Sequence, residues 1–185
     1  MATAGAALEL LHAFALVHDD LMDASPTRRG RPALHRKVAA DHRTVRWSGD
    51  ADRYGSAMAI LTGDLAFALA NRLAASLPAA TRQVWNDMLT ELTAGQFLDL
   101  SGGARHDRSP VLARTIARLK SGRYTVTGPL RLGATLAGHT LPTALERYGD
   151  LIGEAFRSRG AWPRRRGQHV GSSTPPRSNP TSFMR

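Results

Sequence analysis

The 185-residue sequence has no cysteine, which excludes disulfide bonds and thiolate metal sites. Lysine is also rare: of the 25 basic residues, only Lys37 and Lys120 are lysines. No stretch reaches the roughly 20 uninterrupted apolar residues of a membrane-spanning helix. The first residues, MATAGAALELLHAF, carry no basic residue and no cleavage pattern of a signal peptide. These absences predict a soluble, cytoplasmic protein without a membrane span.

Acidic residues are missing from the last part of the chain. The formal net charge is +10, but residues 157–185 hold seven basic residues and no acidic one, which leaves +3 for the residues before them. This segment also has four prolines, five serines and no leucine or isoleucine, so we expect a disordered basic tail. An RNA-binding module is an alternative, but its charge would lie where no fold is expected. We therefore predict a protein that binds no nucleic acid.

Sustained alternation of apolar and polar residues is also missing, so strands are not expected. Apolar residues recur instead at helical spacing, and prolines or glycines separate the segments. We expect helices over residues 6–23, 56–77, 81–100, 110–120, 130–136 and 143–156. The triplet Ser101-Gly102-Gly103 is expected to end the third helix, and Gly122 and Gly128-Pro129 to bend or break the chain after the fourth. The predicted fold class is all-α, and the polar residues 41–55 are placed outside its helices.

Three carboxylates lie at the end of the first expected helix. Asp19 and Asp23 are four residues apart, about 5–6 Å between Cβ atoms on one helix face, and Asp20 lies beside them. Like charges at this spacing repel, and Mg²⁺ would remove the conflict because it takes one or two carboxylates and fills its shell with water and phosphate oxygens. A solvated acidic helix end is the alternative. Arg28 and Arg29 follow closely, and guanidinium groups suit phosphates, so the pattern predicts a diphosphate site.

Residues 8–32, LELLHAFALVHDDLMDASPTRRGRP, resemble the first aspartate-rich region of the trans-isoprenyl diphosphate synthases, the polyprenyl synthetase family. The three aspartates match the family's DDxxD, and Arg28-Arg29 match its RRG. Residues 54–64 are similar to its FGxSxAxLxGD segment, residues 95–100 to its GQxxDL, and Lys120-Ser121-Gly122 to its KTG, with serine for threonine. The resemblance implies a partial polyprenyl synthetase domain over residues 1–156, a partial isoprenoid-synthase helical bundle, followed by the tail at 157–185.

The resemblance implies a prenyltransferase of isoprenoid biosynthesis. Such an enzyme condenses an allylic prenyl diphosphate with isopentenyl diphosphate, head to tail (1'-4), with Mg²⁺ as cofactor. The implied metal ligands are Asp19, Asp20 and Asp23. The implied substrate-binding residues are Arg28 and Lys120 for the allylic diphosphate, Arg29 and His12 for isopentenyl diphosphate, and Gln96, Asp99 and Ser121. The growing chain is expected to pass Phe14 and Ala15, with a C20 product favoured over C15.

Each of these residues also has a structural interpretation. Gln96 and Asp99, three residues apart on a helix, could be satisfied by neighbouring helices. Lys120 could simply complement the C-terminal dipole of its helix, and His12 could be a hydrogen-bonded core histidine. These alternatives stay open at the level of the sequence.

Two parts of the family pattern are missing from this sequence. No Gly-Lys…Arg segment for isopentenyl diphosphate precedes the acidic motif. Residues 148–156 are similar to the lead-in of the second aspartate-rich motif, yet Arg157-Ser158-Arg159-Gly160 follows in place of its aspartates. We interpret this change as a frameshift close to Phe156 and expect little or no turnover from this polypeptide.

Two other functions are weighed against an active synthase. The first is a non-catalytic subunit that forms a homodimer or pairs with a complete synthase. The second is an HD-type phosphohydrolase built on His18-Asp19, which would need further histidine ligands and would not explain Arg28-Arg29 or the GQFLDL segment.

Overall fold

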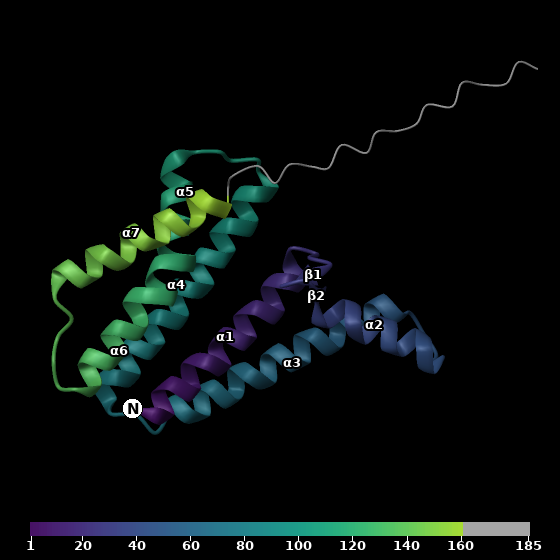
Figure 1. Cartoon of the computed structure of the whole chain (residues 1–185), viewed down its shortest axis with the longest axis horizontal. Coiled ribbons are helices and arrows are strands. Elements are labelled where there is room, and N and C mark those ends of the chain that lie inside the picture. The colour runs from purple at the N-terminus through teal and green to yellow at the C-terminus, as the bar shows by residue number, and fades with distance from the viewer. Residues whose placement is uncertain (161–185) are drawn as a thin grey trace, which may run out of the picture.

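Helices make up nearly all of the fold. The computed structural model describes residues 1–160. Its helical architecture confirms the all-α prediction (Figure 1). The elements are α1 Ala2–Met22, β1 Thr27–Arg28, β2 Arg31–Pro32, α2 Leu34–Val45, α3 Ala51–Ala74, α4 Ala79–Ala104, α5 Pro110–Ile116, the π-helix η1 Ala117–Thr127, α6 Gly128–Leu136 and α7 Thr143–Gly160. The predicted tail falls mostly outside the described residues, and α7 ends at Gly160.

The helices form two groups that meet along α1. In Figure 1, α1 and α3 run side by side, with α2 at the far end of α3, and α4 lies with η1 and α6 beneath α7. Small residues of α1, Ala4 and Ala7, are buried with Leu11. The core cluster joins them to Ala70 and Ala74 of α3, Trp85, Met88 and Leu92 of α4, Tyr124 of η1 and Leu132 of α6. The alanines let α1 lie close to its neighbours and place its C-terminal end beside η1.

Several predicted helix boundaries are wrong, and one helix was not predicted. Helix α1 begins at Ala2 and α3 at Ala51, so residues 41–55, which were placed outside the helices, lie partly in α2 and α3. The short pair of strands β1 and β2 was not expected either. The triplet 101–103 does not end its helix, because α4 continues through it to Ala104 and buries Gly102 against Leu112. Helix α2 covers residues 34–45, a segment that gave no apolar pattern, and it buries His35, Ala39 and His42 on one face. The burial of two histidines explains why a search for apolar spacing missed it.

The chain was expected to bend or break between residues 120 and 130, and it does not break there. α5, η1 and α6 follow one another without a gap. Pro129 lies in the first turn of α6, where a missing N–H costs little. A Cβ at Gly128 would lie 2.5 Å from the Met88 sulfur, and one at Gly122 would lie 2.7 Å from the Gly149 carbonyl. These glycines therefore allow close helix packing and do not end a helix.

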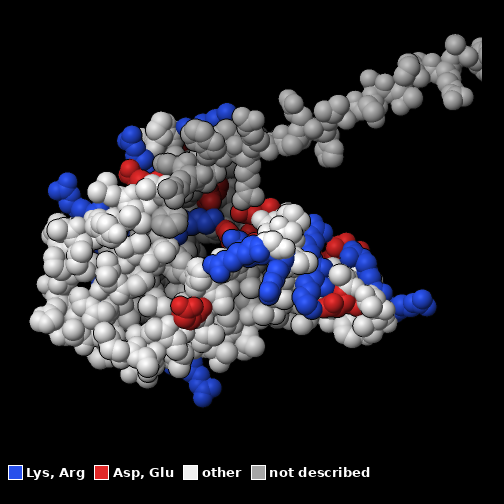
Figure 2. Space-filling model, viewed as in Figure 1, with Lys and Arg blue, Asp and Glu red and all other residues white. Residues whose placement is uncertain are grey.

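Helix α3 carries several exposed large apolar side chains. Ile60, Leu61 and Leu65 are 45%, 60% and 60% exposed. The sequence predicts no membrane span, but α3 is long and apolar enough to cross a membrane, by length and composition alone, with 22% of its most apolar window buried. A helix that packs against another protein surface meets the same criterion. Figure 2 shows few charged side chains over this part of the molecule, whereas Lys and Arg gather over the hairpin and α2.

Candidate functional site

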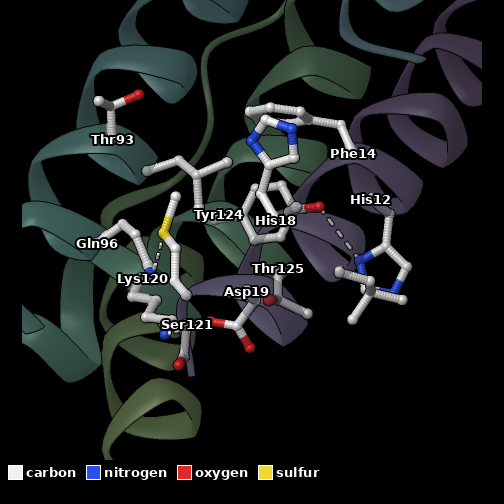
Figure 3. A pocket seen from close by; sticks show the side chains of 14 residues that line it. His12, Phe14, His18, Asp19, Thr93, Gln96, Lys120, Ser121, Tyr124 and Thr125 are labelled. Carbon is white, nitrogen blue, oxygen red and sulfur yellow. Dashed lines mark hydrogen bonds and ion pairs between the residues drawn. The ribbon is translucent and has the colours of Figure 1, made fainter. Parts of the chain in front are cut away.

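A cavity of about 230 Å³ lies between α1, α4 and η1 (Figure 3). Its wall is mostly apolar, with Phe14 and Ala15 from α1 and Leu92 from α4. Phe14 and Ala15 were expected along the growing chain, and five of the ten predicted metal- and substrate-binding residues also line the cavity, namely His12, Asp19, Gln96, Lys120 and Ser121. The five others do not line this cavity; they are Asp20, Asp23, Arg28, Arg29 and Asp99. Of these, Arg28 and Asp23 lie close to Asp19, and Asp99 lies close to Lys120.

The π-helix brings four residues of one element into the cavity. Lys120, Ser121, Tyr124 and Thr125 all line it. A π-helix has a wider turn than an α-helix, with hydrogen bonds from i to i+5, and such turns recur at functional sites. Gly95 of α4 allows η1 to approach, because a Cβ there would lie 2.8 Å from the Lys120 amide nitrogen. The position of Lys120 is therefore fixed by close backbone packing as well as by its side chain.

Lys120 joins two carboxylates that are far apart in the sequence. Its ammonium donates hydrogen bonds to Asp19 Oδ1 at 2.7 Å and to Asp99 Oδ2 at 3.0 Å. Burial lowers the pKa of Lys120, but the two hydrogen bonds and charges outweigh it, so the pKa is raised overall. The lysine is therefore positively charged at neutral pH. The structure thus brings Asp19, Asp99 and Lys120 together.

Arg28 holds the second carboxylate of the acidic motif. Its Nε donates to Asp20 Oδ1 at 2.9 Å and its Nη2 to the same oxygen at 2.6 Å, while Nη2 also lies 3.4 Å from Asp19 Oδ2. The hydrogen bond to Asp20 raises the pKa of Arg28. Asp20 is 5% exposed, so this pair keeps a buried charge compensated. The short hairpin β1–β2 positions Arg28 for this contact.

Asp23 completes the acidic motif, and no lysine or arginine in the described part of the chain donates a hydrogen bond to it. Partial burial raises its pKa, and the charges of Asp19 and Asp99 raise it further, against the smaller effects of Lys120 and Arg28. Negative charge is thus incompletely balanced around Asp23. Within residues 1–155 no three His, Cys, Asp or Glu side chains are close enough to hold a metal ion by themselves. Oxygen donors with surplus negative charge still fit Mg²⁺, which needs only one or two carboxylates when phosphate and water supply the rest.

The remaining predicted residues lie in different surroundings. His12 Nδ1 lies 3.2 Å from the Tyr124 hydroxyl, and the two rings stack. Gln96 donates to the Met22 sulfur at 3.3 Å at the edge of the cavity. Arg29 is exposed in the hairpin turn with φ of 52°. The structure therefore leaves His12 and Arg29 apart from the network around Lys120 and Arg28.

Tyr124 was missed in the sequence, and His18 was considered only for an HD-type phosphohydrolase. Tyr124 is 8% exposed, and burial followed by the charge of Glu9 raises its pKa, so its phenol stays protonated. It is four residues after Lys120, a spacing that could have identified it. His18 packs on Phe14 with ring centroids 4.6 Å apart, and its Nε2 lies 3.2 Å from the Ile60 carbonyl. The His18 ring thus contributes an apolar contact through Phe14, and its Nε2 also lies 3.6 Å from Asp64 Oδ1.

Comparison with known proteins identifies the family. The family model described as "Polyprenyl synthetase" matches residues 1–159. The chain belongs to the polyprenyl synthetase family. The resemblance to this family is thus confirmed. The HD-type phosphohydrolase has no support from a wider His and Asp cluster within residues 1–155.

This polyprenyl synthetase chain is similar to several curated and solved proteins. It is 35% identical to the farnesyl diphosphate synthase of Escherichia coli over 170 residues, covering 82% of this chain and 50% of the relative. It is 35% identical to the small subunit of a heterodimeric geranylgeranyl pyrophosphate synthase from Arabidopsis thaliana over 171 residues, covering 81% of this chain and 44% of the relative.

A solved structure agrees with the fold. The Corynebacterium glutamicum geranylgeranyl pyrophosphate synthase, complexed with isoprenyl diphosphate and magnesium, is 41% identical with a TM-score of 0.79, and the match covers 85% of this chain and 46% of that one. The chain thus spans about half the length of the relatives it matches.

Proposed function

We propose that this chain binds an allylic prenyl diphosphate and transfers its prenyl group to isopentenyl diphosphate. The observation that carries the proposal is the cavity, which is apolar along Phe14, Ala15 and Leu92 and charged at Asp19 and Lys120. A prenyl diphosphate has the same division between a hydrocarbon chain and an anionic end. Farnesyl and geranylgeranyl diphosphate synthases among the relatives support this assignment.

The chain's own residues have separate parts in the proposed reaction. Lys120 and Arg28 bind the allylic diphosphate through their charged N–H groups, and His12 and Arg29 bind the isopentenyl diphosphate. Gln96 and Ser121 complete the polar end of the cavity, and Asp99 binds Lys120 beside it. The apolar wall holds the hydrocarbon chain and keeps water from the allylic carbon, which becomes electron-poor as the C–O bond breaks.

Asp19 and Asp23, with Asp20 once Arg28 releases it, are the proposed ligands for Mg²⁺. These carboxylates would hold Mg²⁺, which would supply positive charge to neutralise the leaving diphosphate. The surplus negative charge around Asp23 supports a cation at this position. We place the protein in the cytoplasm as part of the same proposal.

The cavity wall limits the length of the product. Phe14 packs against Phe67 and His18, with ring centroids 4.8 Å and 4.6 Å apart, so it is held in place beside small Ala15. A fixed aromatic side chain with a small neighbour allows a chain of medium length. We therefore propose a C20 product in preference to C15.

A partner subunit is the second proposed function. The exposed apolar side chains Ile60, Leu61 and Leu65 of α3 suit the interface of a homodimer or of a pair with a complete synthase. Residues 157–185 carry no acidic residue, so we expect little turnover from this chain by itself. In this alternative the chain binds its partner and leaves catalysis to it.

A prenyl-transfer assay tests the proposal. The chain is incubated with radiolabelled isopentenyl diphosphate, farnesyl diphosphate and Mg²⁺, by itself and with a complete synthase, beside Asp19→Ala. We expect a low yield of longer prenyl products that Asp19→Ala abolishes. Products that Asp19→Ala leaves unchanged would contradict the role of the site. The absence of product from the chain alone, together with a change in the partner's product, would support the second function.

A further inference from the structure

Exposed basic side chains and two exposed apolar side chains lie together around α2, away from the cavity. We propose that this surface, the basic patch, docks on an anionic lipid bilayer. The patch consists of exposed residues from the hairpin, from α2 with the turn after it, and from the start of α3, namely Arg31, Arg36, Lys37, Arg43, Val45, Arg46, Trp47 and Arg53. The chain lies on the bilayer surface and does not cross it. This inference is independent of the proposed reaction, because it concerns a different surface.

Positive charge is concentrated in the segment that forms the patch. Residues 27–54 hold eight Lys or Arg and three Asp, a net charge of +5, whereas residues 1–26 and 55–156 together have a net charge of −2. One of the eight, Arg28, is paired with buried Asp20, and the segment keeps +4 without it. Figure 2 shows the cations gathered over the hairpin and α2. Clusters of about four to eight Lys or Arg on one surface attract anionic lipid headgroups.

Acidic neighbours leave half of the patch cations unpaired. The ion pairs within the patch join Lys37 to Asp41, and both Arg36 and Arg43 to Asp52. Among the residues that the structure describes, Arg31, Arg46 and Arg53 have no ion pair with an aspartate or glutamate. A guanidinium group binds phosphate through paired N–H donors. These three arginines can therefore bind lipid phosphates without breaking a contact within the protein.

Val45 and Trp47 are the apolar part of the patch. They are 57% and 55% exposed, although both side chains are large and apolar. The Trp47 ring is nearly perpendicular to the rings of His42 and Tyr54, with centroids 5.9 Å and 5.6 Å away, and its backbone N–H donates to the His42 carbonyl at 3.2 Å. These contacts hold the tryptophan at the end of α2 while more than half of it stays exposed. Tryptophan favours the interface between lipid headgroups and acyl chains.

Arg46 occupies a backbone position that favours glycine. It caps α2 in the left-handed region, with φ of 58° and ψ of 39°, and its N–H donates to the Arg43 carbonyl at 3.2 Å. Glycine is the usual residue at such a cap, because a Cβ raises the energy of this conformation. The arginine thus accepts a backbone cost and adds an unpaired cation next to Trp47. An exposed cation kept at such a position supports a role in binding.

An anionic bilayer fits the patch better than a nucleic acid does. A nucleic acid would contact the cations and could stack a base on Trp47, but it would leave Val45 exposed. A bilayer takes up both apolar side chains among its headgroups, while its phosphates contact the guanidinium groups. The aliphatic side chain beside the tryptophan therefore favours lipid.

Sedimentation with vesicles tests the docking. The whole chain is mixed with vesicles of phosphatidylcholine alone, or of phosphatidylcholine and phosphatidylglycerol in equal parts. The double variant Arg46→Gln, Arg53→Gln is compared with Arg72→Gln, Arg147→Gln, which removes the same charge from exposed positions on α3 and α7. One arginine near an anionic surface strengthens binding about fivefold. We therefore expect the patch variant to bind the anionic vesicles about tenfold or more weakly, and the control to bind them as the unaltered chain does.

Tryptophan quenching distinguishes a bilayer from a nucleic acid. Trp162, which lies outside the described residues, is changed to Phe, so that the fluorescence comes from exposed Trp47 and from Trp85, which is 2% exposed. We expect acyl-brominated lipids in the anionic vesicles to quench Trp47. Vesicle binding without quenching, or binding to single-stranded RNA in preference to vesicles, would contradict the proposal. Equal binding by the two double variants, or binding that does not need phosphatidylglycerol, would also overturn it. None of these measurements depends on prenyl transfer.

Discussion

Gly122 of η1 and Gly153 of α7 lie in direct backbone contact. A Cβ at Gly153 would lie 2.5 Å from both the nitrogen and the Cα of Gly122. This crossing places α7 over the helix that carries Lys120. Gly153→Ala is therefore expected to lower the free energy of unfolding by about 1–3 kcal/mol, the cost of an extra methyl group in a packed interface.

Chemical denaturation of Gly153→Ala measures this effect. Gly133→Ala is the matched control, because a Cβ at Gly133 meets nothing within 4 Å and alanine favours a helix. We expect the control to be neutral or slightly stabilising. Equal stability of the two variants would show that the crossing is not tight.

The contact between Arg28 and Asp20 supports the fold as well as the site. Arg28→Ala leaves the buried Asp20 carboxylate without its forked partner, so we expect a loss of about 1–3 kcal/mol in stability. Arg29→Ala removes the same charge from an exposed position and is expected to change stability by less than about 0.5 kcal/mol. Urea unfolding of both variants measures the difference. A similar effect at the two positions would contradict the assignment.

The pKa of Asp23 differs between the folded and unfolded chain, so the charge of Asp23 makes stability depend on pH. The pKa is raised above 3.8 in the folded chain, so the folded state binds this proton more tightly than the unfolded state. Its contribution to stability therefore falls as the pH rises from about 4 through the folded pKa. Asp23→Asn removes this penalty, and we expect it to be more stable at pH 7 by about 0.2–0.5 kcal/mol for each like-charge pair relieved.

Thermal unfolding at two pH values checks this sign. At pH 3 both forms of residue 23 are neutral, so the unaltered chain and Asp23→Asn are expected to melt at similar temperatures. The advantage of Asp23→Asn should appear only at neutral pH. A lower melting temperature of Asp23→Asn at pH 7 would mean that the charge of Asp23 stabilises the free chain.

The apolar surface of α3 predicts an oligomer. Leu61→Glu together with Leu65→Glu places charges on the exposed part of α3 and should shift the chain to a smaller species in sedimentation or light scattering. Val111→Glu is the control, since Val111 is 71% exposed on α5. If the unaltered chain is already monomeric, or if both variants behave alike, α3 does not form the interface.

Local patterns were sufficient to predict most helices and the acidic motif. The spacing of Asp19 and Asp23 follows from the helix itself, and the apolar periodicity of α1, α3 and α4 follows from their packing. Helix α2 was missed because its buried face contains His35 and His42. The continuous helical chain through Gly128 was missed because this glycine makes room for the side chain of Met88, which lies 40 residues earlier in the sequence. Both features depend on tertiary packing, which a search for local sequence patterns does not detect.

The residues of the site could be predicted from the sequence, but the ion pairs between them could not. The sequence predicts that Lys120 and Asp19 belong to one site. It does not show that Lys120 lies between Asp19 and Asp99, since that contact depends on how η1 crosses α4 at Gly95.

Binding of farnesyl diphosphate to the whole chain tests the central claim most directly. Isothermal titration calorimetry is carried out with and without Mg²⁺, on the unaltered chain and on Asp19→Ala. We predict binding that requires Mg²⁺ and that weakens by about tenfold or more in Asp19→Ala, the scale of losing a group that supports a metal site. Equal binding with and without Mg²⁺, or equal binding by Asp19→Ala, would contradict the claim that this cavity holds a prenyl diphosphate at a metal-dependent site.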